Sequence, residues 1–549
     1  MGFRLHLRQR GKTSKSITED KPREGPFTYI EEEKEGDGKM SMQSIELNGH
    51  SLTLQDVVRV SREDFPVSLD PAAVAFVERG ANMVASWVRD GRVIYGITTG
   101  FGDLASVVIP QEKSELLQHN LLVSHACGVG EPFPEDVVRA IMLLRINTLI
   151  RGFSGISLPT LTLLLNMLNL GIHPIIPCQG SVGASGDLCP LSHLAIALLG
   201  LGEAMYKGKR LPVADAFAQT GLEAVALKPK EGLALNNGTT VLTAVGALTV
   251  YDALHTAKVA DIAAALSLEA LRGVPYAFDP RTHELRPHIG QRQVASNMRR
   301  LIEASEIIEK YKHDRVQDAY SLRCVPQVHG ASRDAVEYVR QKIAVEINSV
   351  TDNPLIFPAE EEAISGGNFH GQPIAIAMDF FGIAAAELAS ISERRVARLV
   401  DAKLSGLPPF LVSNSGLNSG FMIPQYVCAA LVSENKVLAH PSSVDSIPTS
   451  ANQEDHVSMG MYSSRKGRAI LENAEKVLAV ELLCAAQGVE FHKPLQPGRG
   501  TRVARRLIRE HVPFVQEDCF LQPLIEDVLH LVRSGELVQC VEEEIGPLS

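Results

Sequence analysis

The chain has 549 residues, of which 45% are hydrophobic and 21% charged, a balance typical of a soluble globular protein with a sizeable core. A net charge of −11 and an aromatic content of 5% argue against DNA or single-stranded nucleic acid as a partner. The 8 cysteines form no C-x-x-C pair, which argues against a zinc ribbon and favours a reducing, cytoplasmic location.

Residues 1–41 are polar, with a basic start followed by dense acidic residues. A segment so poor in apolar side chains cannot offset its ordering entropy, so we predict a disordered extension rather than a transit peptide. No secretory signal or membrane span is visible, and no membrane partner is expected. We predict an N-terminal domain over residues 42–238 and a second domain over residues 239–549.

The first elements of the folded part are short. An Asn-Gly pair between two alternating runs predicts a hairpin over residues 43–53. Asp70, followed by proline, predicts the start of a helix that ends at Gly91. Apolar residues at helical spacing predict another helix over residues 158–170.

Three long tracts follow, over residues 239–272, 373–404 and 468–488. They are rich in apolar residues but carry charges at intervals, which is unlike a membrane helix. Apolar stripes of this length predict an all-α fold: a long central helical bundle with a smaller, mixed N-terminal region. No short repeat is present, so a solenoid is not expected.

Polar loops interrupt the predicted helices, and a rigid scaffold with such loops at its ends is a common way to position chemistry. Six such polar loops are present, and most of them contain glycine: residues 95–103, 179–188, 233–240, 316–324, 365–371 and 449–456.

The tripeptide Ala184-Ser185-Gly186 lies in the second of these loops, among small and flexible residues. Gly186 has no Cβ, so its amide nitrogen can fold back towards the carbonyl of Ala184. Cyclisation and loss of water would leave a five-membered ring with an exocyclic methylene from Ser185, a strong electrophile. On the tripeptide alone, a plain loop leading into a helix is the simpler interpretation.

The surrounding segment VGASGDLCPLSHLA resembles the prosthetic-group loop of the aromatic amino acid ammonia-lyase and aminomutase family. The resemblance runs from about Met42 to the C-terminal third and includes six motifs in the family's order. It implies that Ala184, Ser185 and Gly186 form 4-methylideneimidazol-5-one (MIO) autocatalytically, with no metal and no diffusible cofactor. The fold implied is the long-helix bundle shared with the aspartase and fumarase group, whose signature loop is not found here.

The resemblance also implies roles for side chains in the other loops. Tyr95 matches the candidate base that removes the β-proton of the substrate. Asn237 would hydrogen-bond the cofactor and stabilise charge there. Arg323 matches the clamp for the substrate carboxylate, which suits a planar guanidinium. The remaining matches are a second tyrosine near the cofactor, a polar site residue and the aromatic ring packed against the cofactor: Tyr320, Gln317 and Phe369.

Two positions indicate which amino acid is the substrate. His125, preceded by Ser124, resembles the histidine-specific form of its segment, and Glu454 matches an acidic residue that meets an imidazole. A carboxylate can accept the imidazole N–H, whereas a phenyl ring would leave that carboxylate buried and unpaired.

The implied reaction is the non-oxidative deamination of L-histidine to trans-urocanate and ammonia, the first step of histidine degradation, with the sites shared in a homotetramer. A tyrosine or phenylalanine ammonia-lyase and a 2,3-aminomutase remain alternatives, and a non-enzymatic helical scaffold is a more distant one. Asn236, Val325 and Gln372 depart from the family's pattern and leave rate and fine specificity open.

Overall fold

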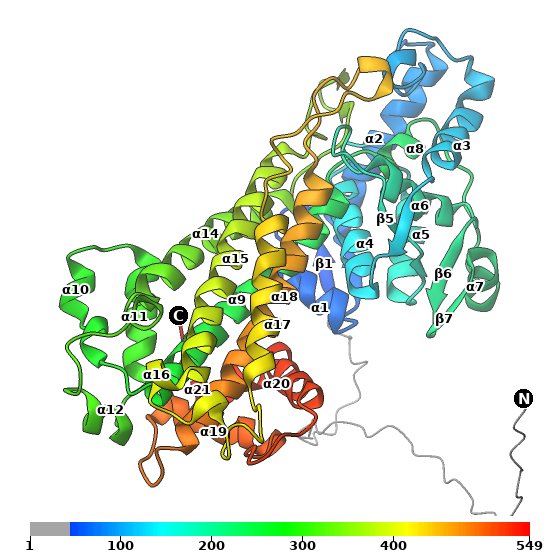
Figure 1. Cartoon of the computed structure of the whole chain (residues 1–549). Coiled ribbons are helices and arrows are strands. Elements are labelled where there is room, and N and C mark those ends of the chain that lie inside the picture. The colour runs from blue at the N-terminus through cyan, green and yellow to red at the C-terminus, as the bar shows by residue number, and fades with distance from the viewer. Residues whose placement is uncertain (1–43) are drawn as a thin grey trace, which may run out of the picture. The chain divides into compact units, whose positions relative to one another are not determined.

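The structure is a computed structural model that describes residues 44–549, and these residues form one compact unit built mainly of helices (Figure 1). The predicted all-α class is therefore confirmed. The predicted extension, residues 1–41, lies outside the described residues. The domain division at residue 238 stays a prediction.

The long helices α9, α14, α15 and α18 form the central bundle (Figure 1). Helix α18 packs along both α15 and α9, and α14 packs against the same two helices. The bounds are α9 (Thr240–Ala270), α14 (Val325–Glu346), α15 (Gln372–Val400) and α18 (Gly460–Glu490). The three predicted tracts are thus helices. The third begins earlier than predicted because Gly467 does not end it. A Cβ at Gly467 would lie 3.2 Å from the ring of Phe381, so this glycine lets α15 and α18 approach closely.

Helix α9 is the centre of the bundle. Its side chains are small, and nearly all of them are buried, including Ala263, Ala264 and Ala265 at 0% exposure. With a rise of about 1.5 Å per residue, its 31 residues span roughly 45 Å. The two ends of α9 are therefore far apart, and this distance decides how the candidate site residues are distributed.

Helix α15 is long and apolar enough to cross a membrane by length and composition alone. In the structure, 67% of its most apolar stretch is buried among the other helices. That burial is typical of a core helix.

The chain enters the bundle through a small parallel pair of strands connected by a helix: β1 (Ile45–Leu47), α1 (Leu54–Arg62) and β2 (Val67–Leu69). The predicted hairpin over residues 43–53 is wrong. The side-chain oxygen of Asn48 accepts the backbone N–H groups of His50 and Ser51 and turns the chain into α1. Strand β1 then pairs with β2, beyond that helix.

Two predicted helices are confirmed. Helix α2 (Pro71–Arg89) begins where Asp70 accepts the N–H of Ala72, and α5 is Leu158–Asn169. The elements that surround the site loops are α3 (Ser114–His125), β3 (Val129–Pro132), α4 (Glu135–Leu149), β4 (His173–Pro174), β5 (Pro177–Gln179), α6 (Leu188–Leu198), β6 (Glu203–Tyr206), β7 (Lys209–Pro212), α7 (Val213–Thr220), α8 (Glu231–Asn236), β8 (Leu355–Phe357) and β9 (Glu362–Ile364).

The remaining helices cover the other end of the bundle or connect its long helices. They are α10 (Pro280–Glu284), α11 (Ile289–Leu301), α12 (Glu306–Tyr311), α13 (Tyr320–Arg323), α16 (Ala402–Ser405), α17 (Met422–Leu438), α19 (Arg499–His511), α20 (Gln522–Ser534) and α21 (Glu536–Ile545), with short 3₁₀ turns at residues 102–104, 111–113, 275–278, 409–411 and 450–452.

Candidate active site

The loop that carries Ser185 connects β5 to α6 and lies beside the N-terminal end of α9. Gly186 has a φ of +72°, and a Cβ there would lie 2.1 Å from the carbonyl oxygen of Gly238. The backbone of Gly238 donates to the Ser185 carbonyl, and the Asp187 N–H donates to the Gly238 carbonyl at 2.7 Å. Only glycine fits at position 186, and the two loops are held together by their backbones.

Asp187 attaches this loop to α9. One carboxylate oxygen accepts the backbone N–H groups of Val241 and Leu242, each at 2.8 Å, and the other accepts the hydroxyl of Ser181. Burial raises the pKa of Asp187 to about 6, although these hydrogen bonds act to lower it. Thr239, the N-cap residue of α9, makes no side-chain cap hydrogen bond. The Asp187 carboxylate therefore caps this helix N-terminus instead.

Ser185 and Glu454 are in direct contact. The Ser185 hydroxyl donates to Oε1 of Glu454 at 2.5 Å, and Oε2 accepts the hydroxyl of Thr449 at 2.7 Å. His125, at the end of α3, lies close enough for the Glu454 charge to act on it. Burial nevertheless lowers the pKa of His125, which favours a neutral imidazole. The serine, the carboxylate and this histidine thus come together from three distant segments.

Tyr95 and Phe369 belong to two loops that close on the same region. The Tyr95 hydroxyl accepts the N–H of Gly102 at 3.2 Å, and a Cβ at Gly102 would meet Ser450, close to Glu454 in the chain. Tyr95 also lines a cavity of about 400 Å³. Phe369 is half-buried, close to Gly371, whose N–H donates to the carbonyl of Gly183.

Asn237 is buried directly before Gly238. Its side-chain nitrogen donates to Oδ1 of Asp352 and to the carbonyl of Asn353, both at 3.2 Å. Oδ2 of Asp352 in turn accepts from Lys230 at 2.6 Å. Sequence reasoning missed Lys230 and Asp352, because a charged residue in a polar segment looks the same whether it is buried or exposed.

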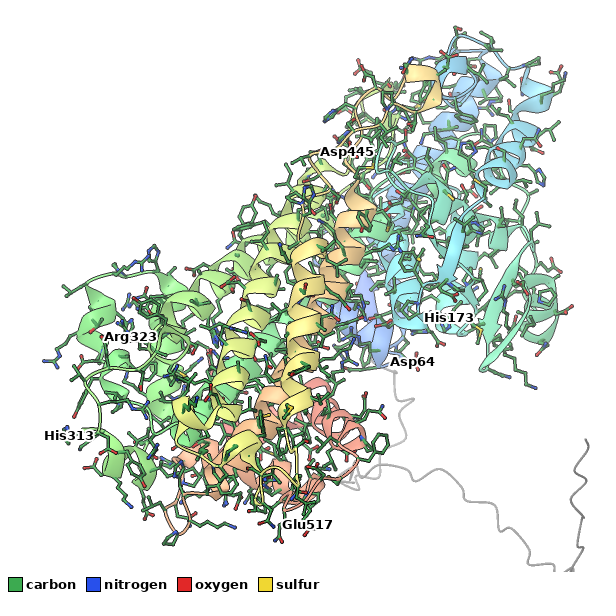
Figure 2. The ribbon with its side chains drawn as sticks, in the orientation of Figure 1. Asp64, His173, His313, Arg323, Asp445 and Glu517 are labelled. Carbon is green, nitrogen blue, oxygen red and sulfur yellow. The ribbon has the colours of Figure 1, made fainter. Side chains whose placement is uncertain are left out.

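Gln317, Tyr320 and Arg323 lie at the opposite end of α9. Their segment is attached there through Asp318, which accepts the N–H of Val274 just beyond that end. Tyr320 is 71% exposed, and the guanidinium of Arg323 lies 4.6 Å from the centre of its ring. Figure 2 shows Arg323 far from Asp445, which belongs to the loop that leads to Glu454. Within one chain, these three residues therefore do not meet Ser185.

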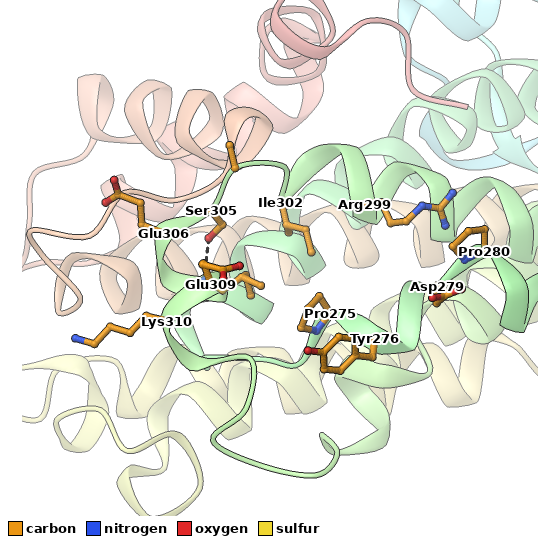
Figure 3. A pocket seen from close by; sticks show the side chains of 12 residues that line it. Pro275, Tyr276, Asp279, Pro280, Arg299, Ile302, Ser305, Glu306, Glu309 and Lys310 are labelled. Atoms are coloured by element: carbon orange, nitrogen blue, oxygen red, sulfur yellow. Dashed lines mark hydrogen bonds between the residues drawn. The ribbon is translucent and has the colours of Figure 1, made fainter.

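A cavity of about 720 Å³ lies among α10, α11 and α12 (Figure 3). Its walls include Tyr276, Arg299 and Lys310, and it contains no side chain that the sequence predicts for the site. Among residues 44–549, no three histidine, cysteine or acidic side chains are arranged to hold a metal ion.

The chain is similar to known proteins over most of its length. Residues 52–510 match the aromatic amino acid lyase family. Histidine ammonia-lyase of Alkaliphilus oremlandii is 55% identical over 504 residues, covering 92% of this chain and 99% of the relative.

Two solved structures are similar over nearly their whole length. Histidine ammonia-lyase from Trypanosoma cruzi has a TM-score of 0.86 at 42% identity, covering 92% of this chain and 96% of that one. Tyrosine aminomutase from Streptomyces globisporus has a TM-score of 0.88 at 38% identity, covering 92% and 100%.

The helical fold and these similarities define the protein as a carbon–nitrogen lyase. The chain belongs to the aromatic amino acid lyase family.

Proposed function

We propose that this protein deaminates L-histidine to trans-urocanate and ammonia, the first step of histidine degradation, with an MIO group formed from Ala184, Ser185 and Gly186. The observation that carries the proposal is the contact between the Ser185 hydroxyl and Glu454, with His125 nearby. Relatives named histidine ammonia-lyase support it.

The residues around Ser185 fit a group of this kind. Gly186 is held at a positive φ where a side chain has no room, and the loop is fixed by backbone hydrogen bonds on both sides. The neighbouring Asn237 oxygen is buried and has no hydrogen-bond partner among the described residues; the ring of such a group carries acceptors only, so this oxygen stays available for another donor. When formed, the group supplies an electrophile that helps an amine to leave, which no ordinary side chain offers.

Glu454 and His125 would recognise the imidazole of the substrate. Glu454 accepts hydrogen bonds in this structure, so its carboxylate can accept an imidazole N–H. The lowered pKa of His125 leaves its ring neutral, and because Nδ1 lies 3.0 Å from the Ser124 hydroxyl, Nε2 is the nitrogen available to the substrate. Tyr95, half-buried and already held by one N–H, would remove the β-proton.

Arg323 would hold the substrate carboxylate, with Gln317 and Tyr320 beside it. Because the Arg323 segment lies at the far end of α9, a second copy of the chain must bring it to Ser185. The bundle carries an apolar face that such a copy could cover, since Ile376, Phe380 and Ile383 of α15 are between 44% and 51% exposed. We therefore propose a homotetramer with shared sites, located in the cytoplasm.

The alternative function within the family is that of a tyrosine or phenylalanine lyase, or of a 2,3-aminomutase. The similarity to tyrosine aminomutase keeps it open. A mutase would retain the ammonia and add it back, whereas a lyase releases it.

The deciding experiment incubates the purified protein with L-histidine, L-tyrosine or L-phenylalanine and follows near-ultraviolet absorbance. We expect a urocanate band with histidine alone and none from the Ser185→Ala variant. A cinnamate or coumarate band would overturn the assignment of Glu454 and His125. Chromatography for β-amino acids separates the mutase from the lyase.

A further inference from the structure

Lys230 and Asp352 form an ion pair that is entirely enclosed. The Lys230 ammonium donates to Asp352 at 2.6 Å, and both side chains have 0% exposure. Burial lowers the pKa of Lys230, although Asp352 opposes this shift. Taking two charges out of water costs more than their attraction commonly returns, so such a pair calls for a role besides stability.

The second oxygen of Asp352 fixes the amide of Asn237. Asp352 Oδ1 and the carbonyl of Asn353 both lie 3.2 Å from the Asn237 side-chain nitrogen. A carboxylate and a carbonyl can only accept, so the atom facing them must be the NH₂ group, and both of its hydrogens are used. The orientation of the Asn237 amide follows from its partners.

This orientation leaves the Asn237 oxygen as the free polar atom of the side chain. The residue is 2% exposed, and the oxygen has no partner in the part of the chain that the structure describes. The next residue, Gly238, is hydrogen-bonded to Ser185 through the backbone. A buried acceptor without a donor is costly, so a ligand that brings an N–H group to this position would be favoured.

We propose that Lys230 and Asp352 are positioning residues that hold Asn237 as a hydrogen-bond acceptor for the amino group of the substrate. The inference rests on the proposed function, because it needs an amino acid bound beside Ser185. An ammonium or amine N–H is the donor that the free oxygen requires. The deaminated product lacks this donor, so its release leaves no hydrogen bond at Asn237 to break.

The Asp352→Asn variant tests the orientation with almost no change of shape. The charged Lys230 ammonium can only donate and makes the stronger hydrogen bond, so it will hold the oxygen of the new amide and turn the new NH₂ group towards Asn237 and the backbone N–H of Asn353, which donates to Oδ1 in the parent protein. Asn237 then meets a donor where it needs an acceptor and cannot keep its present orientation. We expect the site to lose affinity for the amino group alone.

The measurement is calorimetric binding in the Ser185→Ala background, where the substrate is not consumed. The ligands are L-histidine and 3-(imidazol-4-yl)propionate, which differ by the amino group. We expect Asp352→Asn to weaken histidine binding about tenfold or more and to change propionate binding by less than about twofold. In an Asn237→Ala background, the same change should have no further effect on histidine.

Asp261→Asn is the matched control. Asp261 is a fully buried carboxylate paired with Arg333 at 2.8 Å, about 30 Å further along α9 by helix geometry. It should lower the melting temperature and change both affinities alike, because Asp261 reaches the Arg323 segment through His329 and Arg395 and both ligands carry the carboxylate that Arg323 would hold. If Asp352→Asn does not fold, Lys230→Met combined with Asp352→Leu removes both charges and the carboxylate that faces Asn237, and should give a selective loss of histidine binding.

Two results would overturn the positioning role: equal weakening of both ligands, or an Asp352→Asn effect that adds to Asn237→Ala. Failure of the parent Ser185→Ala protein to bind histidine at all would instead overturn the proposed function, and this inference with it.

Discussion

The two ends of α9 carry different parts of the predicted chemistry. At the N-terminal end, Ser185, Asn237 and Glu454 are held by hydrogen bonds from several loops, and one buried acceptor there has no partner within the described residues. At the C-terminal end, Tyr320 is 71% exposed and Arg323 packs on its ring. One end is enclosed, and the other exposes Tyr320, while the Nε of Arg323 is buried there without a partner in the described residues.

This difference bears on how the site is assembled. A residue that serves a site within its own chain is held by that chain, as Glu454 is by Thr449 and Ser185. Tyr320, which is exposed, and Arg323, which is half-buried, make no such contact with the Ser185 loop among the described residues. If both ends serve one site, as proposed, they can meet only between copies of the chain, so variants at opposite ends should complement each other and variants at the same end should not.

The largest expected effect tests this directly. Ser185→Ala and Arg323→Ala should each lower kcat/KM by about two orders of magnitude or more, since one removes the source of the electrophile and the other the carboxylate clamp. Co-expressing the two variants with different tags and purifying the mixed oligomers should restore part of the activity. Some sites will then combine an intact Ser185 with an intact Arg323.

The matched control combines Ser185→Ala with Glu454→Gln. These residues touch within one chain, so no mixed oligomer contains both intact at one site. Mixing should therefore give no gain beyond the residual activity of Glu454→Gln. Equal recovery of activity in both mixtures, or no recovery in the mixture of Ser185→Ala with Arg323→Ala, would contradict the shared site.

Glu454→Gln alone should have the next largest effect. The variant keeps the shape of the side chain but loses its negative charge, and one of its two acceptor oxygens becomes a donor. We expect kcat/KM for L-histidine to fall by about one to two orders of magnitude. Steady-state kinetics with L-phenylalanine make the test decisive. A loss confined to histidine supports imidazole recognition, and equal losses for both substrates contradict it.

The helical framework could be predicted well from the sequence because its signals are local. The cap at Asp70 and the long apolar tracts contain the information that forms α2, α9 and α15. The prediction of a hairpin over residues 43–53 was wrong because the partner of β1 lies beyond a helix. The sequence of neither strand indicates pairing across such a distance.

The site could be predicted only in part. Motifs identified Ser185 and Glu454, but not the ion pair of Lys230 and Asp352, whose burial depends on segments that are distant in the chain. The motifs predicted Arg323 and Ser185 for one site and did not indicate that the two residues lie at opposite ends of α9 within one chain. Which copy supplies Arg323 depends on contacts between chains, which a single sequence does not encode.

The two buried carboxylates at the ends of α9 offer a smaller test. At the site end, Asp187→Asn keeps an oxygen for the two α9 N–H groups but removes the negative charge at that N-terminus. The Ser185 loop should shift slightly, and we expect kcat to fall about tenfold with little change in KM. A change in melting temperature alone, with normal kcat, would show that Asp187 only stabilises the fold.

Glu269, at the opposite end of α9, should affect stability and not activity. It is fully buried and accepts the N–H of Gly498, and burial raises its pKa to about 7. Between pH 4.5 and 7, the folded chain keeps a proton that the unfolded chain has lost, so stability falls as pH rises through this window. The cost is complete above the folded pKa and amounts to about 3 kcal/mol. Glu269→Gln carries no charge at any pH, so its melting temperature relative to the parent should rise from pH 4.5 to 7 while kcat stays unchanged. A constant difference in melting temperature across that range would mean that Glu269 ionises normally in the folded protein.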